Sequence, residues 1–155
     1  MVVKKTKKET VNWYYNGKEI TCLDDMPQGA IAFIYRIDNL NTGKYYVGRK
    51  TFAGNKKKKL TAKEKLLPEN NRKTFKYEFS ESSGWKSYCG SNALLKSEVK
   101  AGHKVVKTIL RFCYTKAEIT LEETRELICG GVLEDSLSYN DWVSCKIFKR
   151  HLTLK

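Results

Sequence analysis

One stretch restricts the possible folds of this chain more than any other. It reads AIAFIYRIDNLNTGKYYVGRK, from Ala30 to Lys50. Ala30–Ile37 is rich in apolar, β-branched and aromatic residues, Asp38–Gly43 carries turn residues, and Lys44–Lys50 resumes an extended pattern. The pattern predicts a β-hairpin.

Two tyrosines are placed to share one face of this hairpin. If Ile37 faces Lys44 across the turn, Tyr35 falls opposite Tyr46. Opposed residues in an antiparallel pair lie on the same sheet face, with Cβ atoms about 5 Å apart. We therefore expect both hydroxyls to line a single cleft. The residues alone also fit an ordinary aromatic hairpin that only contributes to a core.

The charge of the chain favours a polyanionic partner. With 30 Lys and Arg against 17 Asp and Glu, the formal net charge is +13 over 155 residues, which raises the local concentration of phosphate polymers. A solvated basic surface and an anionic membrane are the alternatives. Nucleic acid is favoured because the basic residues form clusters among aromatics and amides rather than along one amphipathic helix.

These clusters are candidate nucleic-acid contacts. Beyond a basic N-terminal arm, which also fits a solubilising tail, a run of four lysines directly follows the hairpin, where it could clamp phosphates. A third cluster lies near position 72. The candidate nucleic-acid-binding residues are Lys50, Lys56, Lys57, Lys58, Lys59, Arg72, Lys73 and Ser91.

Composition also excludes several classes of protein. At 155 residues with 41% hydrophobic residues, one core is expected. The chain has no apolar run long enough to span a membrane and no signal peptide, so we expect an intracellular, cytoplasmic protein without membrane contact. Its five cysteines are odd in number and lack a Cys-x-x-Cys pair, which argues against a disulfide framework and a zinc ribbon. We expect reduced, mostly buried thiols.

Periodicity and turn signals predict the other elements. Asn16-Gly17 indicates an N-terminal hairpin within Val11–Thr21. The polar segment 52–84 is predicted to be a basic insertion with a short helix at Thr61–Leu67, begun by a Thr61-x-x-Glu64 capping box. The remaining elements are expected to be a helix at Ser91–Ala101, a strand at Lys104–Tyr114 and a helix at Thr115–Cys129.

The last helix carries the candidate acid. Helical spacing predicts a packed stripe of Ala117, Leu121, Thr124 and Ile128, with Glu118, Glu122 and Glu126 on the opposite side. Glu123 has Ile119 and Leu127 four residues away on either side, so its carboxylate falls at the border of the packed face. There it needs a cation, a metal or hydrogen bonds. A structural salt bridge to a lysine is an equal alternative.

The hairpin resembles the core of the GIY-YIG nucleases, a family named for two tripeptides about ten residues apart. Here they are Phe33-Ile34-Tyr35, with Phe33 in place of the usual glycine, and Tyr46-Val47-Gly48. The stretch Gly84–Ser91 is similar to that of phage-encoded, homing-type members with a basic insertion. The resemblance implies an α/β (α+β) fold in which helices flank a small central antiparallel three-stranded sheet.

The domain organisation follows from this resemblance. Residues 1–29 are expected to be a basic arm with a hairpin extension, and residues 146–155 a basic tail. The nuclease-like domain covers 30–145, with the insertion at 52–84.

The resemblance also implies metal-dependent hydrolysis of double-stranded DNA. Tyr35 is then the general base, Tyr46 a hydrogen-bond donor to phosphate or water, and Glu123 the ligand of Mg²⁺ (or Mn²⁺). Asn140 matches a downstream asparagine that helps to order the active site. Ser91 either meets phosphate at a helix N-terminus or caps that helix.

The family's helical arginine has no direct counterpart, because Lys56 occupies its position. Arg49, Lys50 and Arg72 are candidates, and we choose Arg49 for its permanent charge and donor geometry. Strict alternation places Lys50 on the tyrosine face of the strand and Arg49 on the other.

Two rival functions remain open from the sequence. One is a non-catalytic nucleic-acid-binding protein that retains the fold, and the other is a small ribosomal or nucleoprotein-like basic domain. A monomer and a transient dimer are equally compatible with the chain. A phage source, suggested by the resemblance, would place the protein in the host cytoplasm.

Overall fold

The computed structural model describes residues 11–146, and the basic arm and basic tail fall largely outside this range. Its strands are β1 (Trp13–Tyr15), β2 (Lys18–Ile20), β3 (Ala32–Asn39), β4 (Tyr45–Thr51), β5 (Ala53–Lys59), β6 (Phe75–Glu81) and β7 (Val105–Cys113). Its helices are α1 (Ala62–Lys65), α2 (Ala93–Lys100) and α3 (Lys116–Cys129), with short 3-10 turns at η1 (Leu23–Asp25) and η2 (Pro68–Asn70). No helix within residues 11–146 has the length and apolar character needed to cross a membrane.

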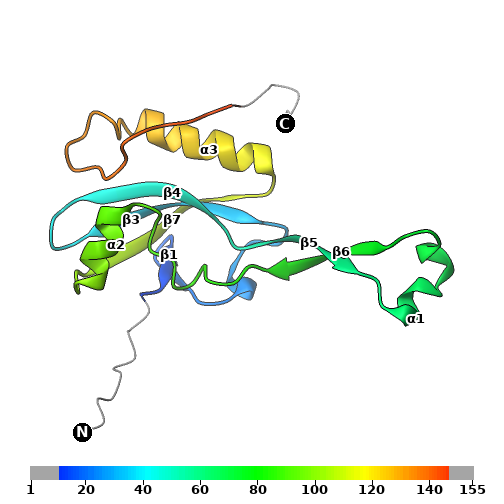
Figure 1. Ribbon diagram of the computed structural model, residues 1–155. Helices are drawn as coiled ribbons and strands as arrows, with labels where there is room; N and C mark the ends of the chain where they lie inside the picture. Colours follow the sequence, from blue (N-terminus) through cyan, green and yellow to red (C-terminus); the bar gives the residue numbers. More distant parts are fainter. Residues whose placement is uncertain (1–10, 147–155) are drawn as a thin grey trace, which may run out of the picture.

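The central sheet has five strands in the order β2-β1-β7-β3-β4 (Figure 1). Strands β4, β3 and β7 pair antiparallel, which confirms the expected three-stranded core. The predicted N-terminal hairpin also forms, and it widens the sheet because β1 pairs in parallel with β7. Its turn residues Asn16 and Gly17 have φ angles of 48° and 78°, the left-handed pair that a two-residue hairpin turn requires.

The register of the β3–β4 hairpin differs by two residues from the predicted one. Tyr35 lies opposite Gly48 rather than Tyr46. Strand β3 continues two residues further than expected, to Asn39, whose backbone N–H donates to the Lys44 carbonyl at 2.8 Å and closes the turn. A shift of two residues keeps each side chain on its face. Tyr35 and Tyr46 therefore still share a face, as diagonal neighbours with ring centroids 6.2 Å apart.

The two faces of the sheet are covered by different helices. Along β3, Phe33, Tyr35 and Ile37 point to the side covered by α2, whereas Ala32 and Ile34 point to the side covered by α3 (Figure 1). This alternation is the ordinary two-residue period of a strand. The first half of the strand, 32–35, is apolar on both faces because both are buried there.

The bounds predicted for α3 are confirmed to within a residue, with Thr115 as its N-cap. The predicted packed stripe is wrong. Ile128 is 61% exposed, and the buried residues of α3 are Ile119, Glu122 and Leu127. Glu122 tolerates burial because it pairs with two arginines, Arg111 Nε at 3.3 Å and Arg125.

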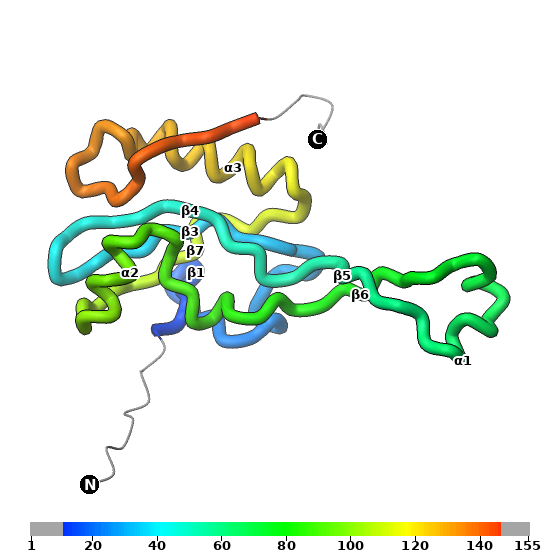
Figure 2. Tube along the Cα trace, viewed as in Figure 1, coloured from blue at the N-terminus to red at the C-terminus, as the bar shows by residue number. Residues whose placement is uncertain are grey.

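The insertion 52–84 forms a two-stranded antiparallel ribbon of β5 and β6 that projects from the body (Figures 1 and 2). The predicted helix is present as α1 at the far end, and Thr61 and Glu64 form the predicted capping box. The strands themselves were not expected, since four successive lysines hide the alternation of β5. Strand β6 shows it as Phe75, Tyr77 and Phe79.

All five cysteines are free thiols, as expected. The expectation that most are buried is wrong, because only Cys113 is. Cys22 and Cys89 are half-buried, while Cys129 and Cys145 are exposed.

Candidate active site

A cavity of about 640 Å³ opens at the edge of β4. It lies between α2, α3 and the segment that follows α3, and it joins residues that are far apart in the sequence. Five predicted site residues line it: Tyr46, Arg49, Ser91, Glu123 and Asn140. The structure therefore brings together most of the predicted site.

Tyr46 points from β4 toward the start of α2. Its hydroxyl lies 2.6 Å from the Ser91 hydroxyl, so the two share a hydrogen bond. Ser91 is free for this contact because Asn92 caps the helix instead, accepting from Leu95 N–H at 3.0 Å. Burial raises the pKa of Tyr46, and the hydrogen bond from Ser91 opposes that rise.

Arg49 and Glu123 form an ion pair between β4 and α3. Arg49 Nε lies 3.2 Å from a Glu123 carboxylate oxygen, and Arg49 also donates to the Thr120 hydroxyl at 3.1 Å. Burial raises the pKa of Glu123, while the guanidinium lowers it. The predicted alternation is confirmed, since Lys50 lies on the other face, with its Nζ 4.3 Å from the centroid of the Tyr88 ring.

Glu122 is not available for a second role at this site. Its buried carboxylate faces β7, where it pairs with Arg111 and with Arg125 of its own helix. The next residue, Glu123, turns toward the cavity. Adjacent glutamates on one helix thus separate a structural ion pair from the candidate functional carboxylate.

Asn140 fixes the edge of β4. Its side-chain oxygen accepts from Val47 N–H at 3.0 Å, and its side-chain nitrogen donates to the Val47 carbonyl at 2.8 Å. Backbone bonds from Tyr45 to Leu137 and from Tyr139 to Tyr45 hold the same segment against the strand. The amide thereby orders the strand that carries Tyr46 and Arg49.

Tyr35 does not line the cavity, which corrects the expectation of two hydroxyls in one cleft. It is 1% exposed and packs against Trp13 at a centroid distance of 5.1 Å. Its hydroxyl donates to Tyr88 at 3.4 Å and lies directly over Gly48. Burial, reinforced by Tyr88, raises the pKa of Tyr35 far above the ordinary value for a phenol. The side chain therefore keeps its proton in this state.

The family described as "Putative endonuclease segE, GIY-YIG domain" matches residues 13–143. This match covers most of the chain, including β1 and every residue of the cavity named above. The chain belongs to the SegE GIY-YIG endonuclease family. Searches among curated proteins and among solved structures returned no significant match.

The GIY-YIG signature residues divide between the core and the cavity. Phe33, which replaces the first glycine of the family pattern, fills the core beside Phe52 at a centroid distance of 5.8 Å. Gly48, the last signature residue, has no room for a side chain, because an added Cβ would lie 2.8 Å from the Tyr35 hydroxyl. The second tripeptide thus allows Tyr35 to pack under the strand.

The basic run after the GIY-YIG hairpin does not reach the cavity. Lys56–Lys59 lie on β5, and Arg72 and Lys73 lie near the far end of the ribbon. Lys56, at the position of the family's helical arginine, donates to the Glu81 carbonyl at 3.0 Å. Among the predicted candidates, Arg49 is therefore the arginine that lines this cavity.

Sequence reasoning missed several residues of the site, Trp142 and Asn92 among them. Trp142 lies at the cavity wall with 73% of its surface exposed. Asn92 joins α2 to the site by donating to the Tyr139 carbonyl at 2.9 Å. Asn is a preferred N-cap, so the signal for Asn92 was present one residue after Ser91. No periodic pattern marks Trp142.

One carboxylate at the cavity is of the kind that a hard divalent cation takes. Residues 11–146 contain no cluster of three or more His, Cys, Asp or Glu side chains. Mg²⁺ keeps several waters and commonly takes only one or two carboxylates. Glu123, on the wall of a polar cavity, provides one carboxylate of this kind.

Proposed function

We propose that this chain is a metal-dependent endonuclease that hydrolyses phosphodiester bonds of double-stranded DNA, of the phage homing type that its sequence resembles. One observation carries the proposal: a tyrosine hydroxyl, an arginine and a carboxylate line the same cavity, at Tyr46, Arg49 and Glu123. The net charge of +13 supports a phosphate polymer as substrate.

Tyr46 is the phenol placed to meet the reacting phosphate or the attacking water. The hydrogen bond with the Ser91 hydroxyl fixes the position of its oxygen. The resemblance implies that Tyr35 is the general base, but the burial of Tyr35 withholds it from water. We therefore propose that Tyr46 contacts the attacking water. Tyr35 instead packs beneath the strand that carries Tyr46.

Arg49 supplies a permanent positive charge to the phosphate. Its guanidinium presents several donors in a fixed plane, and it neutralises charge that develops on the phosphate oxygens. Asn140 acts through position, because its bonds to Val47 hold the strand in place.

Glu123 would hold the cation, Mg²⁺ or Mn²⁺. When bound, such an ion would stabilise the charge on the leaving oxygen. It would also offset the negative charge of Glu123, which adds to the rise that burial causes in the pKa of Tyr46. The pairing with Arg49 opposes the rise in pKa that burial causes at this carboxylate.

Nicking of plasmid DNA in Mg²⁺ or Mn²⁺ tests the proposal. Tyr46→Phe and Glu123→Gln should each reduce the rate at least about 100-fold, as removal of a base or a transition-state contact does. Tyr35→Phe should cost less than Tyr46→Phe, because its hydroxyl lies away from the cavity. Cleavage that survives Glu123→Gln would contradict the site assignment.

A non-catalytic DNA-binding protein is the second candidate. The observation that favours it is the ion pair, in which Arg49 already occupies the Glu123 carboxylate. This function predicts salt-sensitive retention of DNA without cleavage in any divalent metal.

A further inference from the structure

The β5–β6 ribbon has two chemically different faces. Directly opposed residues of an antiparallel pair share a face. The register therefore places one set of side chains on an aromatic face: Asn55, Lys57, Lys59, Phe75, Tyr77 and Phe79. The other set forms an ion-paired face: Lys56, Lys58, Lys76 and Glu78.

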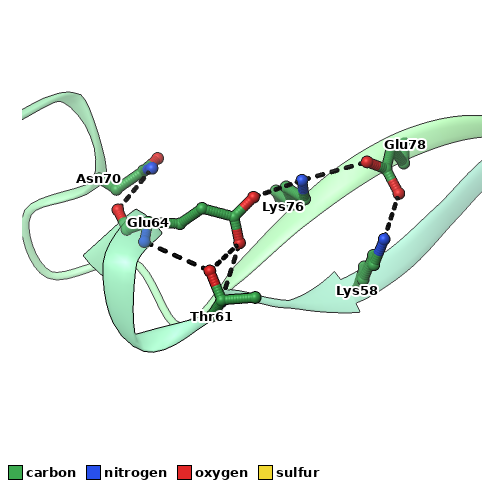
Figure 3. Close-up of polar contacts among 6 residues, drawn as sticks. All are labelled: Lys58, Thr61, Glu64, Asn70, Lys76 and Glu78. Atoms are coloured by element: carbon green, nitrogen blue, oxygen red, sulfur yellow. Dashed lines mark hydrogen bonds and ion pairs between the residues drawn. The ribbon is translucent and has the colours of Figure 1, made fainter. Parts of the chain in front are cut away.

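The charges of the ion-paired face are largely neutralised within the ribbon (Figure 3). Lys58 Nζ lies 3.0 Å from Glu78, and Lys76 lies 3.1 Å from Glu78 and 2.6 Å from Glu64. Glu64 also accepts from Thr61 in the capping box at the start of α1. These contacts join the strands of the ribbon to α1 at its far end.

The aromatic face has no such partners. Tyr77 is 70% exposed and Phe79 54% exposed, an unusual row of large rings in solvent. Among residues 11–146, neither Lys57 nor Lys59 forms an ion pair with a carboxylate. Lys57 Nζ instead lies 4.0 Å from the centroid of the Phe75 ring. This face combines unneutralised positive charge with exposed apolar surface.

The ribbon is anchored to the core that carries the candidate active site. A single residue, Phe52, separates the end of β4 from the start of β5. Phe52 is buried in the core next to Phe33. Trp85, just beyond β6, is also buried, and its indole N–H donates to a Glu81 carboxylate oxygen at 2.6 Å. Both ends of the ribbon are thus fixed to the core that carries Tyr46.

We propose that the aromatic face of the ribbon binds duplex DNA in a groove, beside the phosphate that the cavity holds. The inference rests on the proposed function for its substrate. A two-stranded ribbon is of a size that the major groove admits. Its seven-residue strands are roughly 20–25 Å long, so it spans several base pairs.

The two kinds of side chain on this face have different tasks. Lys57 and Lys59 contact phosphates along the groove, where they displace counterions. Tyr77 and Phe79 make apolar contacts with base edges and sugars. The surface thereby sets where along the duplex the cavity meets the backbone.

The charge contribution is tested with two double variants that remove the same net charge. Lys57→Gln with Lys59→Gln changes the aromatic face, and Lys56→Gln with Lys58→Gln changes the ion-paired face. Both are made in the full chain carrying Glu123→Gln, and binding to a labelled 30-base-pair duplex (about three helical turns) is measured by anisotropy without divalent metal over a series of salt concentrations.

The aromatic-face pair should lower affinity about tenfold and reduce the salt slope by nearly 2. The control variant, Lys56→Gln with Lys58→Gln, should lower the affinity and the salt slope by clearly less, because Lys58 is already paired with Glu78. Equal losses from the two pairs would overturn the proposal.

The aromatic contribution is tested with Tyr77→Ala and Phe79→Ala together. Both side chains are exposed, and an unchanged melting temperature verifies the fold. Duplex affinity should fall severalfold with the salt slope unchanged, because apolar contacts release no counterions. If this double variant loses affinity for single-stranded DNA but keeps its affinity for the duplex, the groove assignment is overturned.

These binding measurements separate the inference from the proposed function. If the aromatic-face lysines matter more for binding than the control lysines, but the chain cleaves no DNA, only the proposed nuclease function is contradicted. Cleavage accompanied by equal losses from the two lysine pairs contradicts only the ribbon surface.

Discussion

Arg49 and Glu123 meet around the edge of β4, with the guanidinium Nε 3.2 Å from a carboxylate oxygen. The strand contributes the arginine and the helix contributes the acid, so the pair ties together the two elements that flank the cavity. The arginine also affects the charge of the acid, because the guanidinium opposes the rise in pKa that burial causes at Glu123.

Arg49→Gln should shift the acid limb of cleavage to higher pH. Without the guanidinium, burial alone acts on Glu123 and its pKa rises further. A carboxylate must be deprotonated to hold a cation, so activity is lost earlier as the pH falls. A pH–rate profile measures the shift, with Arg49→Lys as the control that keeps the charge. An acid limb that does not move in Arg49→Gln contradicts the coupling.

Glu122→Gln should destabilise the fold while Glu123→Gln does not. Glu122 is buried between Arg111 and Arg125, and its loss leaves both guanidinium groups without their partner. We expect a decrease of about 1–3 kcal/mol in the free energy of unfolding. For Glu123, the amide removes a carboxylate that burial already penalises. Urea denaturation compares the two, and equal losses count against this division of roles.

Gly48→Ala should cost about 1–3 kcal/mol of stability through overpacking. The added Cβ would lie 2.8 Å from the Tyr35 hydroxyl and 3.0 Å from a carbon of the Tyr46 ring. Tyr35→Phe removes the nearest atom, so it should recover part of the loss in the double variant. A double-mutant cycle measures this coupling energy. Strictly additive effects would show that the close approach is unimportant.

Lys107 should make stability depend on pH in the alkaline range. It is fully buried, and its Nζ donates to the carbonyls of Lys86 at 2.7 Å and Tyr88 at 3.2 Å. Burial lowers its pKa to about 8 from 10.5. Between these values the unfolded chain binds more protons than the folded one, so the contribution of Lys107 to stability rises with pH.

Comparison with Lys107→Met isolates this effect. The difference in unfolding free energy between the unmodified chain and the variant should grow in favour of the unmodified chain from about pH 8 to about pH 10. A difference that stays constant over this range would contradict the shifted pKa.

The parts of the site that local pattern controls could be predicted from the sequence. Alternation along β4 separates Arg49 from Lys50, and helix periodicity puts Glu123 near a packed border. Asn140 required the resemblance, because a Tyr-Asn-Asp turn has no distinctive pattern. Arg49, Glu123 and Asn140 line the cavity.

The parts that depend on distant neighbours could not be predicted in this way. Tyr35 is buried because Trp13, from the N-terminal hairpin, packs against its ring. Glu122 is buried because Arg111 arrives from β7. In each case the deciding partner lies in another element, and periodicity within one element carries no information about it.

The paired bonds of Asn140 to Val47 have a consequence for how this protein meets other chains. Unpaired N–H and C=O groups at a sheet edge invite another strand to add, and β4 is the outer strand of this sheet. At Val47, the side-chain amide occupies both groups as a neighbouring strand would. An amide that orders the candidate site thus also protects part of this sheet edge from association with another strand. Loss of this side chain is expected to reduce solubility together with activity.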